Sequence, residues 1–310
     1  MGVNLRLEPD KKYIRPGDAA CPGCPEAMGL RYLGMALGDK AILVVPAGCS
    51  AVIQGIIPKN AFHFPTVNIV FAAAASTAAG MAAAYEILGK DAIVVVWAGD
   101  GGTADIGFAS LSGAAERNDN IIYICVDNEA YMNTGIQRSS LTPYGAWTTT
   151  TWTGKREHKK DLPLIMISHR IPYVATASIA YPQDFIVKLK KAASIKGFKY
   201  IHLHAPCPVG WKFDADKTVQ IAKLAIETGM WILFEYYKGR FSISPSSRPY
   251  ADRNKRKPVI EYLKMQGRFK DVTEEVVKEL EQRIEENWTW YLMLEKWSNE
   301  GRDISNLVKR

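Results

Sequence analysis

Two short polar segments, each at the end of an apolar run, could together bind a diphosphate and a divalent cation. The first, Trp97-Ala-Gly-Asp-Gly-Gly-Thr, follows an apolar run and precedes a helical stretch. Glycines let the backbone approach a phosphate closely, a helix N-terminus offers free N–H donors, and Asp100 offers an oxygen ligand suited to Mg²⁺. The second contains Asn128, one helix and one strand further along the chain. Asn128 should therefore return to the same end of a parallel sheet and offer its amide oxygen to the same ion.

Four of the five cysteines could ligate a metal. Cys21 and Cys24 form a CxxC pair near a predicted helix start, while Cys49 and Cys207 each follow a predicted strand. In a reducing compartment such cysteines are metal ligands more often than disulfide partners. Their spacing alone leaves structural zinc and an iron–sulfur cluster equally open. Cys125 lies inside an apolar run and is expected to pack in the core.

The elements that must position these groups alternate along the chain. Short β-branched runs predict buried strands at 41–45, 67–71, 92–97, 121–126, 173–178 and 199–205. Apolar residues at helical spacing predict helices at 25–37, 76–88, 104–117, 182–195 and 214–228. This alternation predicts the α/β class, with a mostly parallel sheet and helices on both faces. We interpret 67–85, which is apolar but mainly alanine, as a buried strand followed by a closely packed helix and not as a membrane span.

The pattern changes near residue 235, where a Ser-, Pro- and Arg-rich stretch is followed by one amphipathic helix. We therefore divide the chain into an α/β domain at 1–235 and a loop and helical extension at 236–310. Asp271 and Glu274 are expected to form a capping box for this helix. The helix could pack on its own domain or dock on another subunit, and its tryptophans are typical of subunit contacts.

The composition is that of a folded globular protein, with 310 residues, 47% hydrophobic and 23% charged. A net charge of +7 invites a nucleic-acid interpretation, but Lys and Arg are scattered and no nucleic-acid motif accompanies them. An acidic protein partner is equally consistent with this charge. The first 15 residues are polar where a signal peptide needs an apolar region. We expect a cytoplasmic protein that binds neither nucleic acid nor membranes.

Five motifs in order along the chain resemble the 2-oxo acid:ferredoxin oxidoreductase family, in particular the β subunit of pyruvate:ferredoxin oxidoreductase (pyruvate synthase). The motifs are CPGC at 21–24, AGCS at 47–50, GDGGTADIG at 99–107, DNEAYMNTG at 127–135 and APCP at 205–208. Gly-Asp-Gly followed by the later Asn also resembles the thiamine-diphosphate signature of decarboxylases and transketolases. The resemblance covers roughly residues 21–235 and implies a thiamine-diphosphate-binding fold.

The resemblance also implies a role for each matched residue. Cys21, Cys24, Cys49 and Cys207 would ligate a [4Fe-4S] cluster, and Glu26 and Cys49 would line the cofactor pocket. The diphosphate would contact Gly99, Asp100, Gly101, Gly102, Asn128, Ala130, Tyr131 and Asn133, and Mg²⁺ would be held by Asp100, Asn128 and the backbone oxygen of Ala130. Asn133 would lie beside the substrate and is the catalytic candidate. As alternatives, Glu26 could only complement a helix dipole and Asn133 could only form a turn.

The activity implied is the reversible, CoA-dependent oxidative decarboxylation of pyruvate to acetyl-CoA and CO₂, with electrons passing to ferredoxin. Nothing in this chain matches the family's motif for the carboxylate that thiamine requires, so an α subunit would complete the site. Separate γ and δ (ferredoxin-like) subunits would complete the enzyme. Three alternatives remain: the same chemistry on branched-chain substrates such as 2-oxoisovalerate, a non-oxidative thiamine decarboxylase, and a zinc-stabilised nucleotide-binding or scaffold protein.

Overall fold

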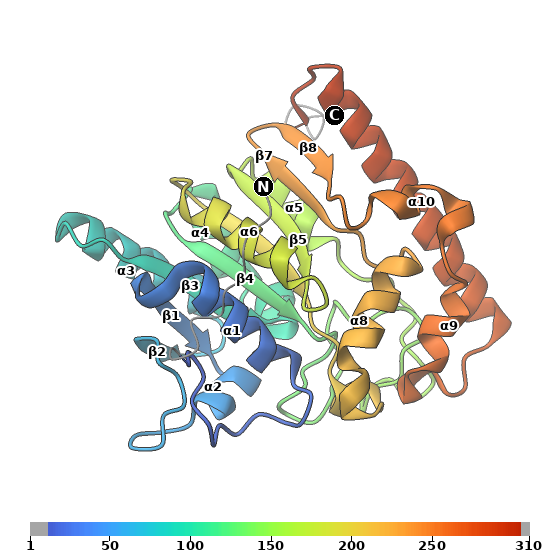
Figure 1. The fold of residues 1–310 in the computed structure, drawn as a ribbon, viewed down its shortest axis with the longest axis horizontal. Coiled ribbons are helices and arrows are strands. Elements are labelled where there is room, and N and C mark those ends of the chain that lie inside the picture. Colours follow the sequence, from blue (N-terminus) through green and yellow to red (C-terminus); the bar gives the residue numbers. More distant parts are fainter. Residues whose placement is uncertain (1–11, 305–310) are drawn as a thin grey trace.

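The computed structural model describes residues 12–304, whose centre is a single eight-stranded sheet (Figure 1). Its strands are β1 (Ala41–Pro46), β2 (Thr66–Ile69), β3 (Ile93–Gly99), β4 (Ile122–Asp127), β5 (Tyr173–Ser178), β6 (Lys199–His204), β7 (Phe234–Tyr237) and β8 (Arg240–Ile243). The order across the sheet is β2-β1-β3-β4-β6-β5-β7-β8. The six strands β1 to β6 pair in parallel, and β7 and β8 add an antiparallel edge. The predicted α/β class is confirmed.

Helices cover both faces of the sheet, which explains why the inner strands β1, β3, β4, β5 and β6 are buried along most of their length. Val94 and Val96 of β3 point into one core, and Val95 and Trp97 into the other, because successive side chains of a strand alternate between faces. The helices α1 (Pro25–Leu37) and α6 (Pro182–Ala193) form the second core. The first core is formed by buried residues of α3 (Ala74–Ile87), α4 (Phe108–Glu116), α5 (Leu162–Ser168), α8 (Thr218–Glu227), α9 (Val259–Lys264) and α10 (Glu274–Asn299).

The parallel strands bring the chemically interesting loops to one edge of the sheet, which we call the carboxyl edge. Neighbouring strands β1, β3, β4 and β6 all end there, and the segments that leave them carry Cys49, Asp100, Asn128 and Cys207. The short helices α2 (Cys49–Gln54) and α7 (Pro208–Trp211) begin at this edge. Ligands of open α/β sheets bind beyond these strand ends.

The interpretation of 67–85 as a buried strand and a closely packed helix is wrong. β2 is an edge strand that pairs only with β1, and none of its four residues is buried. In α3 only Ala74, Ala75 and Ala78 are buried, because the rest of the helix extends away from the sheet (Figure 1). At its end Ile87 is 86% exposed. This apolar helix therefore contributes little to the core of the described chain.

Two helix starts also differ from prediction. The long C-terminal helix is capped by Thr273, whose side chain accepts a hydrogen bond from Val276 N, so the expected capping box with Asp271 is wrong. The helix expected from residue 104 is preceded by a π-helical turn, Gly102–Ile106, and the α-helix begins only at Phe108. Such turns occur frequently at functional sites.

The C-terminal segment packs on the same core as the rest of the chain. The predicted boundary between 235 and 236 falls inside β7, and α10 lies along β8 (Figure 1). Leu280, Ile284 and Trp288 of α10 are buried in the first core. A role of 236–310 in subunit contacts stays a prediction. Among residues 12–304, no helix is long and apolar enough to cross a membrane.

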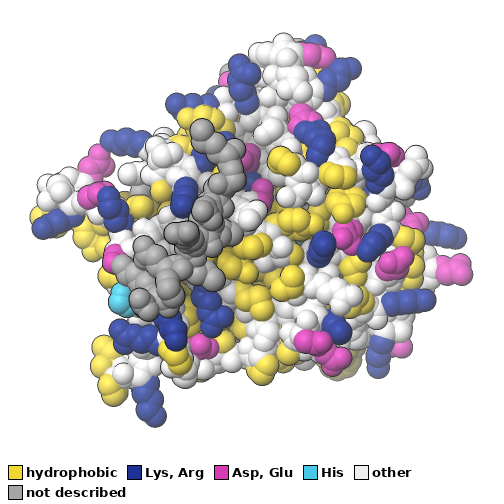
Figure 2. Space-filling model, viewed as in Figure 1, with side chains coloured by type: hydrophobic (Ala, Val, Ile, Leu, Met, Phe, Trp, Pro, Cys, Tyr) yellow, Lys and Arg dark blue, Asp and Glu magenta, His cyan; other side chains and the backbone are white. Residues whose placement is uncertain are grey.

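Charged side chains are spread over the molecular surface. Figure 2 shows Lys and Arg on every side of the visible face, with Asp and Glu between them and with no single basic patch. The net charge of +7 is therefore not gathered into one basic surface on this face.

Candidate thiamine-diphosphate and metal site

One cavity at the carboxyl edge collects all the residues that the sequence assigned to the thiamine cofactor. These are Glu26, Cys49, Gly99, Asp100, Gly101, Gly102, Asn128, Ala130, Tyr131 and Asn133. They come from α1, α2, the turn after β3 and the segment after β4. Asn133 is exposed at the cavity rim, whereas Asp100 and Asn128 are buried. The structure thus places these residues together, while their individual roles stay predictions.

Two glycines of the turn after β3, Gly101 and Gly102, have no room for a side chain. A Cβ atom built on Gly101 would lie 2.5 Å from the ring of Tyr131, and one on Gly102 would lie 2.8 Å from the ring of Phe71. The two rings pack edge to face, with their centres 5.9 Å apart. The hydroxyl of Tyr131 donates to Asp105 Oδ2 at 3.1 Å. Tyr131 therefore holds the turn tightly, so that its backbone lines the cavity and can approach a diphosphate.

Two buried side-chain oxygens in this cavity lack hydrogen-bond partners within the described chain, and both belong to the predicted Mg²⁺ ligands. They are Oδ1 of Asp100 and Oδ1 of Asn128. The other polar atoms of these side chains are engaged: Ser139 Oγ donates to Asp100 Oδ2 at 2.5 Å, and Asn128 Nδ2 donates to Glu26 Oε1 at 3.1 Å. Buried polar atoms almost always find partners, so two such oxygens on one cavity fit a hard cation.

The electrostatics of Asp100 suit a ligand of a cation. Burial raises the pKa of Asp100 well above its usual value, and the nearby carboxylate of Asp127 raises it further. A divalent cation would reverse this effect, because a bound ion is the largest local charge in such a site and favours the ionised carboxylate. The residues present therefore fit Mg²⁺.

Glu26 is a buried carboxyl group at the start of α1. It accepts hydrogen bonds from Ser50 Oγ and from Asn128, and Trp97 Nε1 donates to Ser50 Oγ at 2.9 Å. Burial raises the pKa of Glu26 above its usual value in spite of these hydrogen bonds. Its partners favour a place in the cavity wall over a role limited to the helix dipole.

The four candidate metal-binding cysteines converge on the same end of the molecule. Cys24 precedes α1, Cys49 begins α2, and Cys207 precedes α7, where its sulfur accepts a hydrogen bond from Gly210 N at 3.4 Å. Electrostatic interactions link Cys49 with Cys21, Cys24 and Cys207. Burial, helped by the carboxylate of Glu26, raises the pKa of Cys24 to about 12 and that of Cys207 to about 11.

The four candidate cysteines do not form a closed metal site in this structure. Among the described residues, no group of three or more His, Cys, Asp or Glu side chains is assembled closely enough to hold a metal ion. Three of the four cysteines lie at helix starts, which favour thiolates, but burial outweighs this and raises the pKa of Cys24, Cys49 and Cys207. Cys21 is exposed. Cys125 is buried in β4 and packs in the first core, as predicted.

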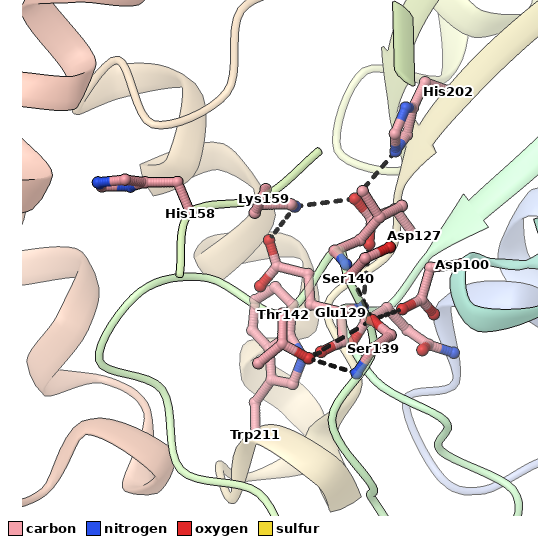
Figure 3. A network of polar contacts seen from close by, with 12 residues as sticks. Asp100, Asp127, Glu129, Ser139, Ser140, Thr142, His158, Lys159, His202 and Trp211 are labelled. Atoms are coloured by element: carbon pink, nitrogen blue, oxygen red, sulfur yellow. Dashed lines mark hydrogen bonds and ion pairs between the residues drawn. The ribbon is translucent and has the colours of Figure 1, made fainter. Parts of the chain in front are cut away.

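The sequence analysis did not identify the polar side chains that contact Asp100 and the two neighbours of Asn128 (Figure 3). Asp127 and Glu129 flank Asn128, and Lys159 Nζ lies 2.8 Å from Asp127 Oδ2 and 2.7 Å from Glu129 Oε1. Ser139, which contacts Asp100, is also completely buried. Neither Ser139 nor Lys159 had a usable sequence signal, because Lys159 lies in the charged run at 155–161, which resembles a solvated loop.

The ion pairs around Asn128 keep both acids charged. Burial alone would raise the pKa of Asp127, but the charge of Lys159 and the hydrogen bond from His202 outweigh it, so the pKa lies below its usual value. For Glu129 the charges of Lys159 and Arg268 likewise outweigh burial and lower the pKa. The Arg268 guanidinium donates to Glu129 Oε2 at 2.5 Å.

The fold and the cavity define a thiamine-diphosphate-binding domain, and the protein family that the chain matches agrees with this. The thiamine pyrophosphate enzyme family, C-terminal TPP binding domain, matches residues 46–203. Among solved structures, the 2-oxoglutarate:ferredoxin oxidoreductase from Magnetococcus marinus is similar with a TM-score of 0.57 at 23% identity, covering 71% of this chain and 82% of that chain. At that identity the likeness concerns the fold alone.

Curated relatives are much closer in sequence. The ketoisovalerate oxidoreductase subunit VorB of Pyrococcus furiosus is 49% identical, over 90% of this chain and 92% of the relative. The pyruvate synthase subunit PorB of Methanothermobacter marburgensis is 48% identical, over 89% and 96%. The chain belongs to the β subunits of 2-oxo acid:ferredoxin oxidoreductases, and it is a subunit of a thiamine-dependent oxidoreductase.

Proposed function

We propose that this chain is the thiamine-diphosphate-, Mg²⁺- and [4Fe-4S]-binding subunit of a pyruvate:ferredoxin oxidoreductase. The enzyme would oxidise pyruvate with coenzyme A to acetyl-CoA and CO₂, reversibly, and pass the electrons to ferredoxin. The observation that carries this proposal is the pair of unpartnered oxygens, Asp100 Oδ1 and Asn128 Oδ1, on a cavity that Cys49 also lines. A cation site and a thiolate that share one cavity suit a thiamine site with an adjacent electron acceptor.

In this proposal the chain's own residues bind and orient the cofactor. Asp100, Asn128 and the Ala130 carbonyl would hold Mg²⁺, and the turn 99–102 would hold the diphosphate through backbone N–H groups. Bound thiamine would supply the electron sink for decarboxylation of the 2-oxo acid. Glu26 would keep a carboxyl group beside the cofactor, and Asn133 at the cavity rim would contact the substrate.

For the four cysteines, an iron–sulfur cluster is preferred to zinc because the neighbouring chemistry releases electrons, which zinc cannot accept. Cys207→Ser should remove the broad absorption near 400 nm and lower the iron and sulfide content of anaerobically purified protein. Cys125→Ala, a change in a buried cysteine of β4, should leave both unchanged. A colourless, zinc-loaded wild-type protein would contradict the cluster.

The proposal also requires partner subunits. An α subunit would provide the carboxylate that activates the thiamine ring, γ and δ subunits would carry further clusters, and ferredoxin would be the final acceptor. We expect the isolated chain to lack 2-oxo acid oxidation. Robust turnover by the purified chain alone would overturn this division of the active site.

Branched-chain 2-oxo acids are the second candidate substrates, because the VorB relatives of Pyrococcus are 49–50% identical to this chain, slightly more than the PorB relatives. The native complex should be assayed for CoA-dependent reduction of ferredoxin or a viologen with pyruvate and with 2-oxoisovalerate. A higher kcat/KM for pyruvate supports the proposal. A higher value for 2-oxoisovalerate replaces pyruvate with the second candidate, and no reduction with any 2-oxo acid rejects both.

A further inference from the structure

The segment after β4 places alternate side chains on opposite sides of one wall. Asn128 and Ala130 line the thiamine cavity, whereas Asp127 and Glu129 line a second cavity beneath α10. In that second cavity a single ammonium group, Lys159 Nζ, binds both acids at 2.8 and 2.7 Å (Figure 3). The predicted Mg²⁺ ligand Asn128 therefore lies between two residues that one lysine holds together.

Asp127 and Glu129 each have a second side-chain partner besides Lys159. His202 Nε2 lies 2.9 Å from Asp127 Oδ2, and Arg268 binds Glu129 Oε2. The Asp127 side chain also accepts a hydrogen bond from Glu129 N through Oδ1, at 3.0 Å. Both carboxylates are buried, at 0% and 4% exposure. Without Lys159, two buried negative charges would repel each other across Asn128.

The backbone here adopts a conformation that needs such support. Glu129 has a φ of +66°, in the left-handed region that non-glycine residues rarely occupy and that costs about 1 kcal/mol or more. Thr142 Oγ1 donates to the Glu129 carbonyl at 2.6 Å, and Trp211 Nε1 donates to the Asn128 carbonyl at 2.7 Å. These contacts fix the backbone carbonyls of Asn128 and Glu129, while Asn128 Oδ1 stays without a partner.

We infer that Lys159 is a positioning residue for the Mg²⁺–diphosphate site: by binding Asp127 and Glu129 together, it holds the strained backbone that presents Asn128 Oδ1 to the metal. In this inference Lys159 would contact neither Mg²⁺ nor the diphosphate and would act only through Asp127 and Glu129. The inference rests on the proposed function, because it assumes that Asn128 ligates Mg²⁺. Groups that orient metal ligands in this way typically contribute 10- to 100-fold in metal affinity.

A second buried lysine provides a matched control. Lys188 of α6 binds Asp184 Oδ2 at 2.6 Å, Thr176 O at 2.9 Å and Ser244 Oγ at 2.8 Å. These partners belong to α6, β5 and the segment after β8, and none lines the thiamine cavity. Lys159→Met and Lys188→Met each remove an internal cation from its acidic partners, which are Asp127 and Glu129 in the first variant and Asp184, 14% exposed, in the second. A purely structural role of Lys159 should therefore make the two variants behave alike.

The test measures thiamine diphosphate retained by the native complex in equilibrium dialysis, as a function of Mg²⁺ concentration, together with the melting temperature. Lys159→Met should raise the Mg²⁺ concentration at half-saturation by about 10- to 100-fold. Lys159→Arg, which keeps the charge, should restore most of the affinity. Lys188→Met should lower the melting temperature but leave the Mg²⁺ half-saturation as in the wild type.

A double variant keeps the inference testable if Lys159→Met folds poorly. Lys159→Met with Asp127→Asn removes one positive and one negative charge together and keeps the Glu129–Arg268 pair, so folding should recover while the Mg²⁺ half-saturation stays raised. Wild-type Mg²⁺ affinity in this double variant, or equal Mg²⁺ effects of Lys159→Met and Lys188→Met, would overturn the positioning role. If the wild-type complex shows no Mg²⁺-dependent retention, the proposed function itself fails, and the inference fails with it.

Discussion

The two sides of the wall formed by 127–130 contrast in how their polar groups are satisfied. On the thiamine side, Asp100 and Asn128 each keep one buried oxygen without a partner. On the other side, Asp127 and Glu129 are fully engaged by Lys159, His202 and Arg268. Among these four side chains, an oxygen lacks a partner only on the side where a cation could supply one.

The difference also has an electrostatic form. Burial and the charge of Asp127 raise the pKa of Asp100, whereas Lys159 and Arg268 overcome burial and lower the pKa of Glu129. Both acids are buried, so burial alone does not decide the direction. What decides it is whether the protein itself supplies the compensating cation. Variants on the two sides should therefore affect stability and ligand binding to different extents.

The largest effect on stability is expected on the satisfied side. Arg268→Met leaves Glu129 Oε2 without its guanidinium, and breaking a buried ion pair costs about 3–5 kcal/mol of unfolding free energy. The measurement is denaturant unfolding of the full chain. Arg302→Met, at an exposed pair with Glu300, should change the unfolding free energy by less than about 1 kcal/mol. Equal effects of the two variants would contradict the contrast.

The largest effect on ligand binding is expected on the unsatisfied side. Asp100→Ala should weaken Mg²⁺-dependent retention of thiamine diphosphate by more than about 100-fold, since a direct ligand matters more than an orienting neighbour. The same variant should not lower the melting temperature of the ligand-free chain, because it removes a buried carboxylate whose pKa burial raises. A large loss of stability with unchanged retention would assign Asp100 to the supporting side.

A smaller effect is expected where one side chain supports a ligand directly. Ser139 Oγ donates to Asp100 Oδ2, so Ser139→Ala should weaken Mg²⁺ affinity by about tenfold in the same dialysis experiment. Ser112→Ala removes a comparable hydrogen bond, 2.8 Å from His169 Nε2, that is remote from the cavity. That control should leave Mg²⁺ affinity unchanged. An unchanged affinity in Ser139→Ala would show that Asp100 needs no help from Ser139.

The last prediction concerns pH on the satisfied side of the wall, where His204 lines the second cavity together with Asp127 and Glu129. Burial lowers the pKa of His204 to about 3, from the usual 6.5, so neutral His204 favours the folded state above pH 6.5 and this contribution is lost as pH falls. Glu129, whose pKa is lowered from 4.5, favours the folded state above pH 4.5 and loses that contribution below it. Unfolding free energies measured from pH 7 to 3.5 should therefore decline in two stages.

Two variants separate these stages. His204→Phe should flatten the decline between pH 6.5 and 4.5, and Glu129→Gln should flatten only the part below pH 4.5. If His204→Phe leaves the upper stage unchanged, another group titrates there. If Glu129→Gln changes the upper stage and not the lower one, the assignment to Glu129 is wrong.

The amino-acid sequence was sufficient to predict which residues gather at one cavity, while their functions stay predictions. Positions 101 and 102 of the turn must be glycines, because the rings of Tyr131 and Phe71 occupy the space of a side chain at each. All ten residues assigned to the cofactor line one cavity, since strands of a parallel sheet return their carboxyl ends to one edge. The six predicted parallel strands formed near their expected bounds.

The sequence was insufficient where environment depends on distant neighbours. The pattern at 67–85 is apolar, but whether a strand is central or at an edge depends on the order of strands in the sheet. The strands β7 and β8 were missed, because the first is only four residues long and the second begins the Ser- and Pro-rich segment. The same segment gave no hint that α10 would cover the core beside them.

The sequence by itself therefore determined the α/β class, the diphosphate turn and the candidate ligands Asp100 and Asn128, because short-range rules of spacing and residue type govern them. Only the tertiary structure decided which polar groups are left without partners. Lys159 and Ser139 lie within 32 residues of Asn128 in the chain. Lys159 contacts Asp127, and Ser139 contacts Asp100, only because the loop at 139–160 folds back over the carboxyl edge. Burial and pairing of charges arise from that packing, and no local pattern records them.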